Sequence, residues 1–207
     1  MNKKGILLFL SILLIALVSC SEAPKKAQKT KEPAKPAEPV TGRYAFHQMF
    51  AAARSWSMDI EALKLNSITL PSVKHVDGKA PAWQVTFVSR EKQRAKSWTY
   101  SVVEAEGNLH KGVFAGLEET YSGPRGTTKP FLIAALKEDS DHAYKVATSK
   151  AADYMKKNPD KEIVYQLELS GRYPNPAWRV IWGDSVSHSN FSVLVDASTG
   201  QYLETLH

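Results

Sequence analysis

The sequence predicts an α+β fold made of two tandem units, each with one helix packed on an antiparallel sheet. Three observations support this prediction. The tripeptide Pro-Ala-Trp occurs at 81–83 and again at 176–178. Each copy opens a segment in which apolar and polar residues alternate, and an alanine-rich stretch precedes each copy. Because the order helix, strand, strand, strand recurs, we expect an internal duplication over 44–128 and 129–207.

The expected helices cover residues 44–57 and 140–157. In the second stretch, apolar residues recur at steps of three and four, as on one face of a helix: Ala143, Val146, Ala147, Ala151 and Tyr154. Ser140 and Asp141 are expected to cap its start. Asn158-Pro159 is expected to end it, because a residue that precedes proline disfavours helical backbone angles.

The strand segments have a period of two. Strands are expected at 62–70 and 162–169, and after each Pro-Ala-Trp. The bulky apolar residues of each strand fall on one face: Trp83, Val85 and Phe87; Trp98, Tyr100 and Val102; Trp178, Val180 and Trp182. We expect this face to pack on the helices and the mixed, partly polar face to meet water.

A second correspondence joins the two units. It aligns Glu104 with Asp196, which are 92 residues apart, whereas the tryptophans of the two Pro-Ala-Trp copies are 95 residues apart. The first unit is therefore expected to carry three extra residues around 90–96. The segments 104–107 and 196–200 both end in glycine and are interpreted as hairpin turns, not as carboxylate sites. Residues 108–139 fit neither unit.

The first 43 residues have the character of an export and anchoring segment. Residues 1–19 carry lysines at positions 3 and 4 and continue with an apolar run too short to span a bilayer as a helix. Leu17-Val18-Ser19-Cys20 resembles the lipobox of bacterial lipoproteins. This resemblance implies cleavage before Cys20, acylation of Cys20 with chains such as palmitate, and attachment to a membrane. Residues 20–43, rich in proline and lysine, are expected to form a flexible tether.

Location and charge exclude several classes of partner. The resemblance implies the cell envelope, and Ser21 after the cysteine implies the outer membrane, facing the periplasm, if the host has two membranes. Eight of the 27 basic residues but three of the 21 acidic ones lie in residues 1–43, which leaves 19 basic against 18 acidic residues. We therefore expect no nucleic-acid binding.

A single cysteine excludes an internal disulfide, and the histidine spacing predicts no metal site and no cofactor.

The second unit carries a family resemblance. Pro176-Ala177-Trp178-Arg179-Val180, followed by the segment 191–202 with its Val-Leu-Val-Asp-Ala-Ser-Thr-Gly core, is similar to PepSY-like domains. The resemblance implies a helix on a curved antiparallel sheet, as in cystatin-like folds and tandem β-lactamase inhibitor proteins. It also implies an extracytoplasmic role in binding or restraining other proteins, proteases among them. The first unit is degenerate, since Glu104 replaces the aspartate.

One segment resembles a catalytic motif. Gly183-Asp184-Ser185-Val186 is similar to the nucleophile motif of a lipase family, but it lies close to the C-terminus instead of the start. We interpret it as a hairpin loop and predict that the protein is not an enzyme. The candidate partner face is the mixed side of the sheet, which alternation assigns to Gln84, Thr86, Thr99, Arg179, Ile181, Ser192 and Leu194.

The sequence thus predicts a lipid-anchored, non-catalytic envelope module that binds an envelope protein, with inhibition or regulation of a protease or hydrolase as one form of this role. Two alternatives stay open. One is a carrier or sensor that holds a small ligand in a cavity between helix and sheet. The other is a structural envelope lipoprotein that belongs to a larger complex.

Overall fold

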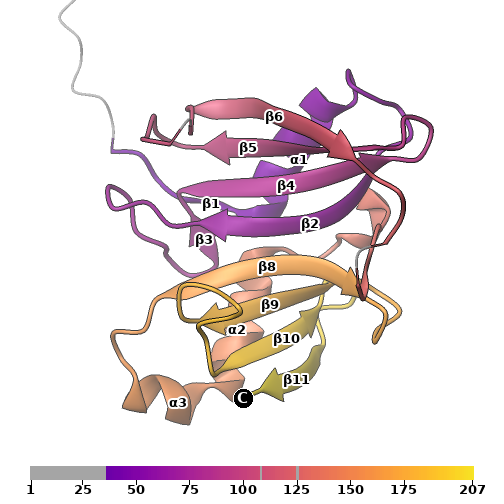
Figure 1. Ribbon diagram of the computed structural model, residues 1–207. Coiled ribbons are helices and arrows are strands. Elements are labelled where there is room, and N and C mark those ends of the chain that lie inside the picture. Colours follow the sequence, from indigo (N-terminus) through magenta and orange to yellow (C-terminus); the bar gives the residue numbers. More distant parts are fainter. Residues whose placement is uncertain (1–35, 108, 125) are drawn as a thin grey trace, which may run out of the picture. The chain divides into compact units, whose positions relative to one another are not determined.

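A computed structural model describes residues 36–207 apart from Asn108 and Arg125. Residues 1–35, which hold the expected signal peptide, Cys20 and most of the tether, lie outside the described residues. The described chain has an α+β fold, as predicted, with a large antiparallel sheet and its helices on one side of that sheet (Figure 1).

The chain forms its elements in two successive groups. The first contains β1 (Val40–Thr41), α1 (Gly42–Ala53), β2 (Glu61–Ile68), β3 (Lys79–Ala80), β4 (Ala82–Ser89), β5 (Arg94–Ser101) and β6 (Gly112–Thr120). After β7 (Thr128–Lys129) and a 3₁₀ turn (Ile133–Ala135), the second contains α2 (Ser140–Lys150), α3 (Ala152–Lys157), β8 (Ile163–Ser170), β9 (Ala177–Trp182), β10 (Ser192–Asp196) and β11 (Tyr202–Leu206).

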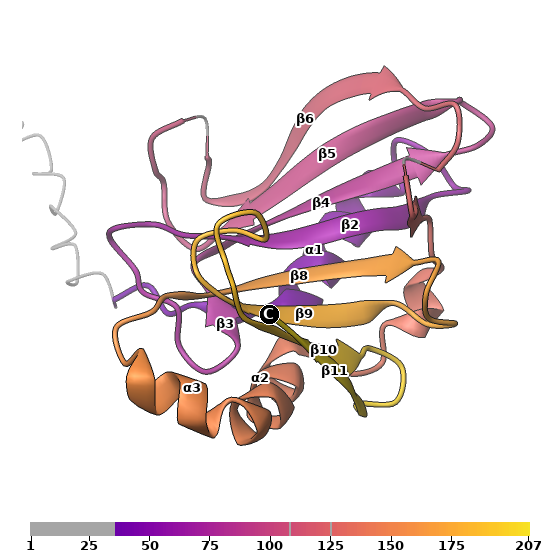
Figure 2. The same cartoon turned by 60° about the horizontal axis from the view of Figure 1, so that its bottom comes forward.

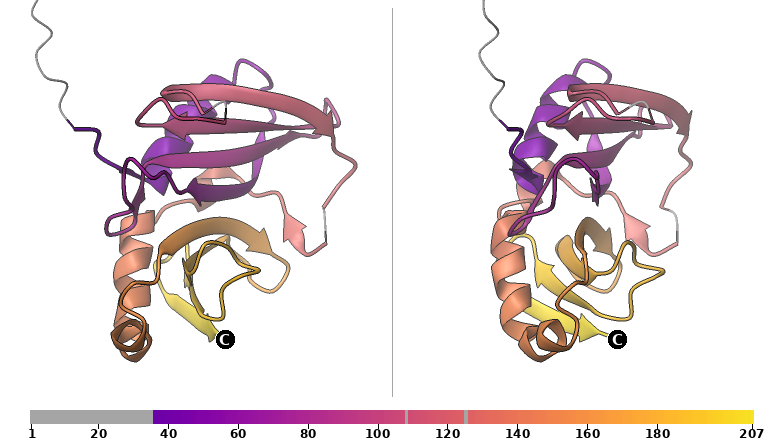
Figure 3. Two further views of the ribbon diagram at one scale, coloured as in Figure 1. Left: turned by 60° about the vertical axis from the view of Figure 1, so that its left-hand side comes forward. Right: turned by 90° about the vertical axis from the view of Figure 1, so that its left-hand side faces the viewer.

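The strands of both groups join in one sheet of order β11-β10-β9-β8-β2-β4-β5-β6. Strand β7 adds to β8, and β1 pairs with β3 outside this sheet. Figures 2 and 3 show α1 and α2 against the same face of the sheet. One core cluster fills the space between them, because the apolar strand face and the apolar helix stripes exclude water together. Its largest fully buried side chains include Trp83, Trp178, Trp182, Phe46 and Met49.

The two groups meet at the centre of the sheet through β2 and β8. Their antiparallel ladder is short, and Asn66 lies opposite Gln166. Beyond this ladder, side chains join the strands. The Tyr165 amide donates to Ser67 Oγ at 2.9 Å, and the ring nitrogens of His75 lie 2.7 Å from the Ile163 carbonyl oxygen and 3.3 Å from that of Ile68.

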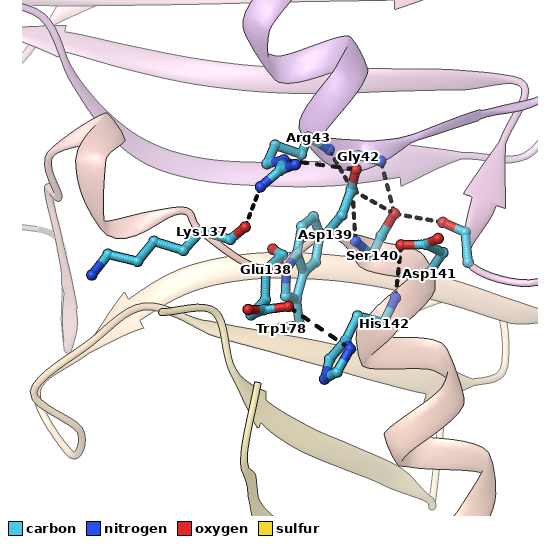
Figure 4. A network of polar contacts seen from close by, with 10 residues as sticks. Gly42, Arg43, Lys137, Glu138, Asp139, Ser140, Asp141, His142 and Trp178 are labelled. Carbon is cyan, nitrogen blue, oxygen red and sulfur yellow. Dashed lines mark hydrogen bonds and ion pairs between the residues drawn. The ribbon is translucent and has the colours of Figure 1, made fainter. Parts of the chain in front are cut away.

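The groups also meet where α1 and α2 begin (Figure 4). Asp139 Oδ1 accepts hydrogen bonds from the amides of Arg43 (2.8 Å) and Ser140 (2.7 Å). Ser140 Oγ accepts from the Gly42 amide (2.8 Å) and donates to the Gly78 carbonyl (2.5 Å). The first amides of a helix have no partner within it, so residues at the start of α2 satisfy those of α1.

The tryptophans of the two Pro-Ala-Trp copies lie together beneath these helix starts. Their rings make an edge-to-face contact with centroids 6.1 Å apart. Trp83 Nε1 donates to the Val40 carbonyl at 3.0 Å, and Trp178 Nε1 donates to the Glu138 carbonyl at 2.9 Å. Each carbonyl belongs to the second residue before a helix. The expectation that both tryptophans are core residues is confirmed, since both are fully buried.

Several predicted boundaries need correction. Helix α1 begins at Gly42 and Val40–Thr41 pair with β3, so the last residues assigned to the tether 20–43 belong to the folded unit. The expected helix 140–157 is interrupted at Ala151. Its cap is Asp139, whose side chain accepts from the Ser140 amide, and not Ser140 or Asp141.

Two edge strands were not predicted, β6 and β11, so each helix is followed by four strands of the main sheet and not three. The expected alignment of Glu104 with Asp196 is wrong. Ser101 lies opposite Ala82 in the same way that Asp196 lies opposite Ala177, and both offsets are 95. The first group therefore has no three extra residues between these strands.

Candidate functional site

The face of the sheet opposite to the helices carries a row of side chains, one from each strand. The strand registers align Phe114 with Thr99, Thr99 with Gln84, Gln84 with Asn66, and so on across the sheet. We call this the transverse row. From β6 to β11 its members are Phe114, Thr99, Gln84, Asn66, Gln166, Arg179, Leu194 and Glu204.

The row contains four of the seven residues assigned to a partner face from alternation: Gln84, Thr99, Arg179 and Leu194. Thr86 lies on the same face one pair further along β4, with its hydroxyl 3.2 Å from that of Ser97. Two assignments need correction. Ile181 and Ser192 share this face, but they are only 2% and 1% exposed. They cannot offer a contact area to a partner in this arrangement.

A hollow of about 530 Å³ lies at the β6 end of the row. Its walls include Gln84, Thr99, Phe114 and Leu117. Phe114 is 43% exposed and Leu117 is 92% exposed, both unusually high for large apolar side chains. The Thr99 hydroxyl is shielded from solvent and has no hydrogen-bond partner among the described residues.

A second hollow, of about 410 Å³, lies at the centre of the face. Its floor includes Asn66, Gln166 and Ile181, and residues 184–187 of the β9–β10 loop form one wall. Figure 1 shows this loop in front of β8 and β9. The loop explains why Ile181 is buried although it points away from the core. The half-exposed Val186 adds an apolar side chain to this wall.

The β11 end of the row is charged but balanced. Burial lowers the pKa of the Arg179 guanidinium, and the carboxylates of Glu168 and Glu204 oppose this effect. Arg179 Nε donates to Ser192 Oγ at 2.9 Å, and Arg172 pairs with Glu204 at 2.7 Å. Because acidic and basic groups alternate here, the face has no strong electrostatic preference for a polyanion.

In the segment that resembles a lipase motif, Ser185 and His188 each contact Asp184. The His188 ring lies 3.3 Å from a carboxylate oxygen of Asp184. The hydroxyl of Ser185 contacts Asp184 and Ser187, and it accepts from the backbone amide of His188. A nucleophile and its base must be within hydrogen-bond reach, and the described contacts do not join the Ser185 hydroxyl to the ring.

Residues 196–200 form a hairpin turn between β10 and β11, as predicted. Asp196 Oδ1 accepts from the amides of Ser198 and Thr199, and Gly200 has a φ of +74°. Partial burial alone would raise the pKa of the Asp196 carboxyl. Hydrogen bonds from Asn175, Ser198 and Thr199 outweigh burial and lower the pKa. The Asp196 carboxylate thus stabilises the turn through these hydrogen bonds.

Within residues 36–207, excluding 108 and 125, no three side chains of His, Cys, Asp or Glu gather in a way that could hold a metal ion. The helices of that same part are all too short or too polar to cross a membrane.

The space between helices and sheet is filled with side chains. Four large aromatic side chains are fully buried there and belong to the core cluster between helices and strands: Trp83, Trp178, Phe46 and Phe87. A small-ligand cavity was expected between helix and sheet under the carrier alternative, which stays open: beside this core, a hollow of about 550 Å³ is lined by Tyr144 of α2 and by Ile163 and Tyr165 of β8.

Comparison with known proteins adds no relative: no protein-family model, no curated protein and no solved structure matches the chain. The site therefore stands on its geometry alone. Sequence reasoning missed five of its residues: Asn66, Gln166, Phe114, Leu117 and Glu204. Phe114 and Leu117 lie on β6, whose pattern does not alternate, and Glu204 lies on β11, which was not predicted. Asn66 and Gln166 become neighbours only through the long-range pairing of β2 with β8.

Proposed function

We propose that the chain is a lipid-anchored, non-catalytic module of the bacterial cell envelope that binds another protein through the transverse row. The observation that carries this proposal is the composition of the uncovered sheet face. Two exposed apolar groups, Phe114 and Leu117, line a hollow together with the neutral amide of Gln84, and the neutral amide of Asn66 follows Gln84 along the row. Apolar anchors with a polar surround are typical of protein interfaces.

The remaining features agree with this role. Charges on the face are balanced, which does not favour a nucleic acid or a strongly charged ligand. The lipobox at Cys20 would hold the module at a membrane, and the tether would let the face reach a neighbour. Inhibition or regulation of an envelope protease or hydrolase is one form that such binding would take.

We also propose that the two groups of elements are tandem copies of a PepSY-like unit. Trp83 and Trp178 occupy equivalent strands at an offset of 95. Each indole donates to the second residue before a helix. The pairing of Asn66 with Gln166 places equivalent strands side by side at the centre. These correspondences support a duplication in which the row crosses both copies.

The test is affinity capture from an envelope extract of the host, with the full-length chain as bait. Phe114→Asp and Leu117→Asp place a charge in the β6 hollow. Met58→Asp is the matched control, because Met58 is 70% exposed beside the end of α1. We expect one protein to be captured by the wild type and the control, and its recovery to fall at least tenfold with either face variant. Equal recovery by all four baits would contradict the proposal.

A further inference from the structure

The two edges of the sheet differ in how they meet solvent. Strand β11 has five residues, and its side chains are engaged: Arg172 pairs with Glu204 and Lys150 lies over the Tyr202 ring. Strand β6 has nine residues and projects at the opposite edge (Figures 1 and 2). Among the described residues no strand pairs with the outer edge of β6. Long edge strands with exposed apolar residues are sites of strand pairing.

The register fixes which backbone groups of β6 point outward. The Tyr121 amide donates to the Gln93 carbonyl, next to β6. Hydrogen-bonded and non-bonded pairs alternate in an antiparallel ladder. Glu118, three residues before Tyr121 and opposite Lys96, therefore belongs to a non-bonded pair, and its amide and carbonyl point away from β5. At the other end, the Val102 amide donates to the carbonyl of Pro81, the residue before β4. The same alternation directs the amide and carbonyl of Ala115 outward.

We propose that two copies of this chain associate by antiparallel pairing of their β6 strands. The bulge opposite Lys96 and Trp98 leaves outward groups on Ala115 and on Glu118, three residues apart. A two-fold axis between Gly116 and Leu117 places Ala115 of one copy opposite Glu118 of the other, and the reverse. Each such pair can exchange two backbone hydrogen bonds, so the edge is complementary to itself.

The side chains support a second copy as the occupant. In this register Leu117 of each copy covers Gly116 of the other, where no side chain competes for the space. Leu117, the most exposed large apolar residue in the described part of the chain, would thereby lose contact with water. Each glutamate at 118 faces an alanine, so the antiparallel arrangement opposes no like charges. The same surface patch serves both copies, as in a closed two-fold dimer.

The pairing leaves the transverse row of each copy accessible. A two-fold axis through an antiparallel strand pair is perpendicular to the sheet, so the helices of both copies lie on one side. Both transverse rows lie on the other side and form one surface, with the two β6 hollows next to the axis. The pairing takes Leu117 away from the partner surface and leaves Phe114 there. The inference does not depend on the proposed function, because the edge can pair whether or not the face binds a protein.

The test is the mass of the full-length chain in detergent, measured by sedimentation velocity over a dilution series with micelles in excess. Glu118→Pro removes the outward amide, and proline is tolerated where an edge amide faces solvent. Glu118→Ala is the matched control, since it removes the same side chain and keeps the amide. Leu117→Lys changes an exposed side chain that the fold of one copy does not use.

We expect two copies per particle for the wild type and Glu118→Ala, and one copy for Glu118→Pro. Leu117→Lys should weaken association roughly a hundredfold, because each of two leucines contributes about tenfold. A wild type with the mass of one copy at every concentration would overturn the inference, and a strand from another protein would then be the better occupant. Association that survives in folded Glu118→Pro and in Leu117→Lys would overturn it as well. If thermal unfolding shows that Glu118→Pro does not fold, Leu117→Lys decides alone.

Discussion

Gly42 is the position where one added methyl group should disturb both halves of the protein. A Cβ there would lie 2.5 Å from the tip of the Trp178 ring and 3.0 Å from that of Trp83. Neither ring can withdraw freely, because each indole nitrogen is bonded to a carbonyl at 3.0 Å or less. The backbone at Gly42 is helical, so strain at this position would come from the ring contacts alone.

The expected cost of Gly42→Ala follows from these contacts. Overpacking a rigid core costs about 1–3 kcal/mol, and loss of one indole hydrogen bond adds about 1 kcal/mol. The better helix propensity of alanine offsets up to about 1 kcal/mol. We therefore expect a net loss of about 2 kcal/mol, or a fall in Tm of roughly 4–8 °C for a unit of this size.

Urea unfolding, followed by tryptophan fluorescence and by circular dichroism, would measure the loss. Gly171→Ala is the control, since the nearest atom to its added Cβ is a flexible lysine carbon at 3.7 Å. This control should be neutral or slightly stabilising. If Gly42→Ala were as stable as the wild type, the two tryptophans would not be held as the hydrogen bonds indicate.

Three further predictions concern other parts of the molecule. Burial would raise the pKa of the Asp59 carboxyl, but hydrogen bonds from Glu91, Ser89 and Ser57 lower it from 3.8 to about 2. A lowered folded-state pKa gives stability that is present above the unfolded value and lost on acidification. Asp59→Asn should therefore cost about 1 kcal/mol at neutral pH, allowing for solvent screening, and urea midpoints of the two proteins should converge between pH 4 and pH 2. His75→Phe keeps a ring beside Tyr165 but loses the ring nitrogens that contact the Ile163 and Ile68 carbonyls, so calorimetry should show a loss of about 1 kcal/mol; an unchanged Tm would contradict the bridging role. Thr99→Val removes a buried hydroxyl without a described partner and should raise stability by up to about 1 kcal/mol; a lower urea midpoint would show that the hydroxyl stabilises the folded protein.

The strands that carry the tryptophans could be predicted because their core side chains recur with a period of two. Strand β6 escaped prediction for two physical reasons. It lies at an edge, so neither face is fully buried, and a bulge opposite Lys96 and Trp98 breaks its alternation. The alignment of Glu104 with Asp196 failed because it rested on a short stretch of similar residues. The true equivalence depends on the register of neighbouring strands, which the sequence alone does not show.

The candidate site was predictable to a similar extent. Alternation alone placed Gln84, Thr99, Arg179 and Leu194 on the uncovered face, and the registers confirm that placement. It could not show that the β9–β10 loop closes over Ile181, because loop paths depend on tertiary contacts. Nor could it bring Asn66 beside Gln166, since that contact links strands about 100 residues apart.

The most direct test of protein binding through the transverse row is photo-crosslinking in intact cells of the host. A photoreactive phenylalanine analogue would replace Gln84, at the middle of the uncovered face, or Lys145, on the exposed side of α2. Binding through the row predicts an adduct with one envelope protein from position 84 and none from position 145. Adducts with the same protein from position 145 only, or from neither position in correctly anchored and folded chains, would contradict it.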